Sequence, residues 1–201
     1  MNNSALSTYD LVIVGTGAAG LMAALTALDR GARVCIVEAD SWIGGATALS
    51  EGMIWVPNNP EARALSDAPA PEEEAESALA YLRATAGNFF DSARVDLYIA
   101  QAPKALDLAN KLGGIRFSLS RYSRDYYPEA KGATLGRRAL NPLPASMRDM
   151  DRGLFSKLRR PLGTMMVFKG LSIASQDAGD YINLGRNLAA FVRVAGHVLR
   201  F

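Results

Sequence analysis

Hydrophobic residues near the start of the chain form two short unbroken runs, Leu11–Val14 and Val34–Val37. Both runs are rich in β-branched residues, which favours strands. The stretch between them, Ala18–Asp29, holds one β-branched residue, Thr26, and is followed by Gly31, as in a helix that ends at a glycine. A strand, a helix and a strand within about 30 residues predict a βαβ unit.

The loop between the first run and the helix carries the spacing G-x-G-x-x-G at Gly15, Gly17 and Gly20. In a dinucleotide-binding unit the first glycine permits a tight turn, the second lets the backbone approach a pyrophosphate, and the third lets the helix pack closely on the strand. The helix that begins at Ala18 and Ala19 points its free N–H groups at the phosphates. The alternative is a glycine turn without a ligand.

Glu38 ends the second hydrophobic run, 18 residues after Gly20. An acidic residue at this place accepts hydrogen bonds from the ribose hydroxyls of the adenosine. Its charge would repel a 2′-phosphate, so the sequence disfavours NADP.

A second glycine- and hydroxyl-rich loop follows, which a simple NAD-binding unit does not need. GTGAAG, Glu38 and the later run GGATALSEGMIWVPNN together resemble the flavoprotein family of fumarate reductases and 3-ketosteroid dehydrogenases, and most of all its ketosteroid Δ1-dehydrogenase branch. In that family the second loop lies along the ribityl chain and isoalloxazine of FAD. The resemblance therefore implies FAD, with contacts from Gly44, Gly45, Thr47, Ser50 and Gly52.

Flavoproteins of the succinate dehydrogenase type have a histidine just before the threonine of this loop, and that histidine bonds covalently to the flavin. Here Ala46 precedes Thr47. The resemblance therefore implies FAD that is held without a covalent link. His197 is the chain's one histidine, and we expect it to be solvated or structural and no metal site to form.

The run Arg124–Pro128 lies in a segment rich in tyrosine, proline, glycine and arginine. In the ketosteroid dehydrogenase branch a loop of similar composition, with an Asp-Tyr pair, reaches into the substrate cavity. The resemblance places Tyr126 where that branch has an active-site tyrosine that supports the catalytic base. Tyr127 is a second candidate. A tyrosine in an irregular loop is by default a packed ring with its hydroxyl at the surface.

The middle of the chain predicts two helices. The first covers 71–86, because Pro71 suits a first turn and the three glutamates after it favour the positive end of the helix dipole. The second covers about 93–112, capped by Asp91 or Ser92, and Pro103 predicts a kink or a break within it.

The last third of the chain is less regular. Residues 115–119 predict a short strand, and 163–174 are apolar, as expected for one side of a substrate pocket or a dimer contact. Residues 184–201 predict a basic amphipathic helix, whose apolar face docks on a partner domain or lies on a membrane surface.

Composition narrows the class of protein. The 201 residues are 49% hydrophobic and 21% charged, which is ordinary for a soluble globular protein. A net charge of +2 disfavours a nucleic-acid binder. The uncharged stretch 11–28 holds three glycines in six residues, which argues against a membrane span. The single cysteine, Cys35, has no disulfide partner within the chain, which fits a cytoplasmic setting.

We therefore predict an α/β fold: an incomplete Rossmann-like FAD-binding domain at 1–115, then the start of a substrate-side or capping region at 116–201. The resemblance implies an enzyme that dehydrogenates an apolar ketone or steroid and passes hydride to flavin N5. Members of the family are more than twice as long, so we expect an N-terminal fragment that is inactive alone. The alternatives are a fumarate-type ene-reductase and a non-catalytic flavin-binding module.

Overall fold

The computed structural model describes residues 8–50, 52–120, 123–143, 150–160, 166–167, 171–172 and 177–200. In chain order the elements are β1 (Leu11–Val14), α1 (Ala18–Asp29), β2 (Val34–Val37), β3 (Ile54–Trp55), α2 (Pro60–Arg63), α3 (Pro71–Thr85), α4 (Ser92–Gly113), β4 (Phe117–Leu119), β5 (Ala139–Pro142), α5 (Arg152–Ser156), β6 (Met166–Val167), β7 (Leu171–Ser172), α6 (Ala178–Ile182) and α7 (Leu188–Arg200).

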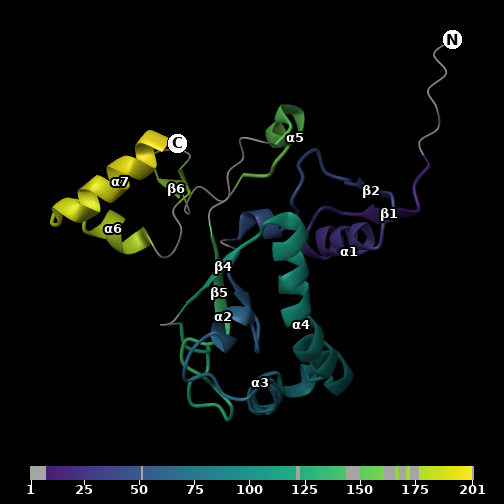
Figure 1. The fold of residues 1–201 in the computed structure, drawn as a ribbon, viewed down its shortest axis with the longest axis vertical. Helices are drawn as coiled ribbons and strands as arrows, with labels where there is room; N and C mark the ends of the chain where they lie inside the picture. Colours follow the sequence, from purple (N-terminus) through teal and green to yellow (C-terminus); the bar gives the residue numbers. More distant parts are fainter. Residues whose placement is uncertain are drawn as a thin grey trace.

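The predicted βαβ unit is present. Strands β1 and β2 are parallel, with Leu11 opposite Val34 and Val14 opposite Val37. Helix α1 packs against both strands and also against α4, as Figure 1 shows. The opposite face of β1 is bare, because the side chains of Val12 and Val14 are 57% and 80% exposed.

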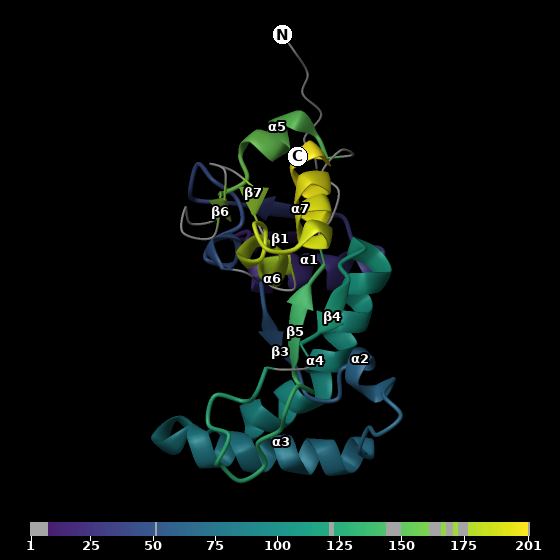
Figure 2. The same cartoon turned by 90° about the vertical axis from the view of Figure 1, so that its left-hand side faces the viewer.

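A second, antiparallel sheet lies below this unit, with the strand order β3-β5-β4 (Figure 2). Ile54 pairs with Leu140, and Phe117 pairs with Pro142. Neither β3 nor β5 was predicted, because β3 has only two residues and β5, at Ala139–Pro142, is neither an unbroken apolar run nor rich in β-branched residues. Strands β3 and β5 come from the two regions predicted on either side of residue 115, yet they share one sheet. The domain boundary at residue 115 stays a prediction.

The two long helices form as predicted. Helix α3 begins with Pro71 in its first turn. The Asp91 side chain caps α4 by accepting a hydrogen bond from the N–H of Arg94 at 3.2 Å, and Gly114 ends the helix in the left-handed conformation, with φ of 61°. Pro103 lies inside α4, which continues through it. Figure 2 shows α3 lying across one end of the molecule.

The C-terminal part differs from its prediction. The helix expected at 184–201 begins at Leu188, because residues 183–186 form a turn between α6 and α7. Arg193 of α7 pairs with Asp180 of α6 at 2.6 Å. Ala190 and Val194 are buried, whereas Leu188 remains 80% exposed. Most of the apolar stretch 163–174 lies outside the described residues. No helix in the described ranges has the length and apolar character that a membrane crossing needs.

Candidate functional site

The first glycine loop has the geometry that its spacing predicts. Gly15 has φ of +97°, a conformation that side chains strongly disfavour. A Cβ on Gly20 would lie 2.1 Å from the carbonyl oxygen of Gly15 and 3.4 Å from a methyl group of Ile13. Gly20 therefore lets α1 pack directly on the turn and on β1. A Cβ on Gly17 would meet its nearest neighbour, the hydroxyl of Thr47, at 4.0 Å, so the space over Gly17 is open.

Glu38 lies beside this loop with both carboxylate oxygens bonded. Oε2 accepts from the backbone N–H of Thr16 at 2.9 Å and from the Thr16 hydroxyl. Oε1 accepts from the N–H groups of Ala39 at 2.9 Å and Asp40 at 3.1 Å. These hydrogen bonds, the Thr16 hydroxyl first among them, lower the pKa of Glu38 from 4.5 to about 2. A ribose hydroxyl bound here would have to share these oxygens with the chain's own donors.

Two threonines join the second glycine loop to the first. The hydroxyl of Thr16 accepts from the N–H of Gly44 at 2.8 Å, and the hydroxyl of Thr47 accepts from the N–H of Ala18 at 3.1 Å. A Cβ on Gly45 would lie 3.3 Å from the Cα of Gly17, so the backbones of the two loops also approach each other closely. Thr16 was not predicted as a site residue, although a hydroxyl residue between the first two glycines was a usable signal.

The rest of the second loop leads to the antiparallel sheet. The Ser50 hydroxyl donates to the Thr47 carbonyl at 2.8 Å and accepts from the N–H of Gly52 at 3.1 Å, which forms a turn. A Cβ on Gly52 would lie 3.0 Å from the ring of Pro142 in β5. The loop thus ends against the sheet, and β3 begins two residues later, at Ile54.

A cavity of about 650 Å³ opens on this sheet. One wall is Met53, Ile54 and Trp55, which follow Gly52 directly along the chain. The remaining lining residues are Tyr81, Leu82, Thr85, Ser123, Arg124, Asp125, Tyr126, Tyr127 and Ala139. Most of this lining is apolar or aromatic, and this volume is typical of small-molecule sites.

Tyr126 lies at this cavity with 95% of its surface exposed, and Tyr127 is 55% exposed. The default expectation of a packed ring therefore does not describe Tyr126. Trp55 stacks on Tyr81 with ring centroids 5.9 Å apart, and on Tyr98 at 6.5 Å. Tyr98 donates its hydroxyl to the carbonyl of Trp55, and burial raises the pKa of Tyr98.

Residues 10–173 match the sequence model of a family described as the FAD binding domain. The chain belongs to this FAD-binding family. FAD is accordingly its cofactor, and its fold is α/β as predicted.

Its relatives include a 3-oxosteroid 1-dehydrogenase from Mycobacterium tuberculosis, 36% identical over 71% of this chain and 24% of the relative. A 4-oxocyclohex-2-ene-1-carboxylate 5-dehydrogenase from Sinomonas cyclohexanicum is 32% identical over 95% of this chain and 31% of the relative. The crystal structure of 3-ketosteroid Δ1-dehydrogenase from Sterolibacterium denitrificans, in complex with 1,4-androstadiene-3,17-dione, superposes with a TM-score of 0.76 and 26% identity. The superposition covers 96% of this chain and 33% of the Sterolibacterium denitrificans chain. The chain thus spans between a quarter and a third of these relatives' length.

The two glycine loops fit FAD. Gly17 leaves its backbone open to a pyrophosphate, and α1 has neither an acidic residue in its first turn nor a side-chain cap on Gly17, so the positive end of the helix faces that space. The N–H of Ala18, expected to be free for the phosphates, instead donates to the Thr47 hydroxyl. Ala46 carries no group that could bond covalently to a flavin. The individual contacts expected of Ala19, Glu38, Thr47 and Ser50 with the cofactor stay predictions.

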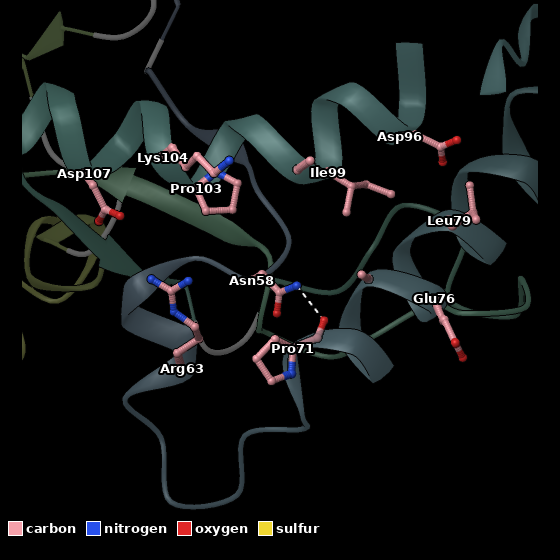
Figure 3. Close-up of a pocket in the computed structure, with 12 residues that line it drawn as sticks. Asn58, Arg63, Pro71, Glu76, Leu79, Asp96, Ile99, Pro103, Lys104 and Asp107 are labelled. Carbon is pink, nitrogen blue, oxygen red and sulfur yellow. Dashed lines mark hydrogen bonds between the residues drawn. The ribbon is translucent and has the colours of Figure 1, made fainter. Parts of the chain in front are cut away.

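A second cavity, of about 430 Å³, lies between α2, α3 and α4 (Figure 3). Asn58 closes one side by donating to the carbonyl of Pro71 at 2.7 Å. Arg63 and Lys104 lie near one end, and Glu76 and Asp96 lie near the other. None of its lining residues in the described part of the chain belongs to a glycine loop.

Proposed function

We propose that this FAD-binding chain serves an oxidoreductase that dehydrogenates an apolar cyclic ketone of the 3-ketosteroid kind. The observation that carries the proposal is the cavity of about 650 Å³ whose wall continues directly from the second glycine loop. A substrate there would lie beside the cofactor and in contact with Tyr126. The names of the steroid and oxocyclohexene dehydrogenases among the relatives support the same reaction class.

In this proposal each group of residues has a separate task. Gly15 and Gly17 bring the backbone to the pyrophosphate at the start of α1, Gly20 lets α1 pack on β1, and Glu38 binds the adenosine ribose. Bound FAD supplies the hydride acceptor, at its N5. Tyr126 lines the cavity and supports the group that removes a proton from the carbon beside the carbonyl.

A second candidate substrate is a cyclic ketone that carries a carboxylate. Arg124 lines the cavity, is exposed, and has no ion pair within the described part of the chain. The relative from Sinomonas cyclohexanicum is named for such an acid. A small dicarboxylate such as fumarate fits less well, because Arg124 is the one cationic residue in the described lining.

The experiment is a binding titration followed by Trp55 fluorescence. Trp42→Phe removes the other of the two tryptophans and leaves Trp55, in the cavity wall, as the sole reporter. With FAD present, 1,4-androstadiene-3,17-dione should quench Trp55 in a saturable way. Arg124→Gln should not alter this affinity, but it should weaken binding of 4-oxocyclohexanecarboxylate. If neither ketone quenches Trp55 fluorescence, the proposal is contradicted.

A further inference from the structure

The backbone on both sides of Tyr126 is fixed, although its side chain is almost fully exposed. Asp125, which precedes it, is 6% exposed. The N–H of Tyr127, which follows it, donates to the hydroxyl of Tyr81 in α3 at 3.2 Å. The backbone therefore fixes the position of Tyr126, while its ring stays free of packing contacts on most of its surface.

Asp125 is anchored through both carboxylate oxygens. Oδ1 accepts from the indole N–H of Trp55 at 2.6 Å. Oδ2 accepts from the N–H of Thr134 at 2.9 Å, from the Thr134 hydroxyl at 3.4 Å, and from the Arg138 guanidinium at 3.1 Å. Asp125 therefore links the cavity wall, the far side of its own loop and Arg138, which immediately precedes strand β5.

Arg138 connects this anchor to helix α3. Its side chain is 0% exposed. It donates to Glu74 at 2.6 Å, to the hydroxyl of Ser77 at 3.0 Å and to the carbonyl of Gly132 at 2.8 Å. Its guanidinium also lies over the Trp55 ring, 5.3 Å from the centroid.

This cluster places two carboxylates and one guanidinium out of contact with water, with the side chains of Glu74 and Asp125 only 8% and 4% exposed. Apolar residues of similar volume often stabilise a fold as well as such ions do. Ions held by directional hydrogen bonds instead define one arrangement of the groups that they join. The group joined here is the loop that carries Tyr126.

We propose that Asp125, held by Arg138 and Trp55, is a positioning residue that presents the Tyr126 hydroxyl to the substrate cavity. The proposal rests on the proposed function for the substrate itself. Asp125 lines the cavity, but its carboxylate already accepts hydrogen bonds from Trp55, Thr134 and Arg138. Its effect on substrate binding therefore passes through Tyr126.

A double-mutant cycle tests this coupling in the Trp42→Phe chain with FAD present. Tyr126→Phe should weaken binding of 1,4-androstadiene-3,17-dione by about fivefold, the usual effect of one lost hydrogen bond. Asp125→Asn should weaken it by a similar factor. The double variant should remain at about fivefold, whereas independent effects would multiply to about 25-fold. Multiplied effects, or unchanged affinity in Asp125→Asn alone, would overturn the proposal.

The matched control is Asp67→Asn, which removes an exposed partner of the neighbouring Arg137. It should leave the affinity unchanged. If Asp125→Asn does not fold, Arg138→Lys replaces it in the cycle, because lysine keeps the charge but loses the forked pairing.

Amide hydrogen exchange separates this proposal from the function on which it rests. Asp125→Asn should speed exchange of residues 126–133 by about tenfold or more and leave α4 unchanged. If the wild-type chain binds no diketone, the proposed function fails and the exchange result alone decides the positioning role. Exchange that is unchanged in the loop, or that rises equally in α4, would overturn it.

Discussion

Gly17 and Gly20 lie in one loop but are required for different reasons, which two alanine variants can separate. Gly20→Ala should destabilise the fold by about 1 to 3 kcal/mol through overpacking, because the new Cβ would lie 2.1 Å from the carbonyl of Gly15. Gly17→Ala should unfold at the wild-type temperature, because φ of −71° suits alanine and the nearest atom is 4.0 Å away. Thermal unfolding measures both. Equal destabilisation by the two variants would contradict these separate roles.

Glu38 predicts a defined dependence of stability on pH. Its folded-state pKa of about 2 lies below the ordinary 4.5, so its charge stabilises the fold fully above about pH 4.5. This contribution is lost as the pH falls through 2. The wild-type chain should therefore be more stable than Glu38→Gln at neutral pH, and the difference should shrink below pH 4.5. A difference that does not change with pH would show that the charge contributes nothing.

At the scale of elements, the link between α3 and β5 depends on one buried arginine. Arg138→Met should destabilise the fold by about 3 to 5 kcal/mol, because it leaves Glu74 and Asp125 buried without their partner. The neighbouring Arg137→Met should cost about 1 kcal/mol or less, because Asp67, its partner, is 72% exposed. Urea unfolding of both variants checks the contrast. If the two variants lose similar amounts of unfolding free energy, Arg138 is not the residue that links α3 to β5.

The elements that were predicted correctly are those whose signals are local. Helices α1, α3 and α4 have a proline or glycine at an end and a helical composition between. Strand β3 becomes a strand by pairing with β5 across more than 80 residues, and β5 by pairing with both β3 and β4. Helix α7 begins at Leu188 rather than at 184, because a turn there lets it pack against α6. The hydrophobic periodicity of the sequence does not indicate this turn.

The same distinction applies to the site. The glycine loops and Glu38 could be predicted, because the dinucleotide motif is contiguous. Arg138, Glu74 and Asp125 come from three separate segments, and each alone reads as an ordinary charged residue. Only the fold brings them together beneath Tyr126.

For the whole molecule, the bare face of β1 has a consequence in solution. Parallel sheets are normally covered on both faces, but here Val12 and Val14 are exposed. We expect the chain to self-associate as its concentration rises. The double variant Val12→Thr, Val14→Thr should associate less, since threonine keeps the β-branch but is more polar. Sedimentation equilibrium measures this, and unchanged association would place the contact on another surface.

The central property proposed for this chain is that its two glycine loops together bind FAD without a covalent link. Calorimetric titration of the chain with FAD tests this most directly, with Gly17→Ala as the folded control. The account predicts saturable binding of one FAD, full release of the yellow colour on acid precipitation, and loss of binding in Gly17→Ala. A folded wild-type chain that binds no FAD, or a Gly17→Ala chain that binds it equally well, would contradict the account.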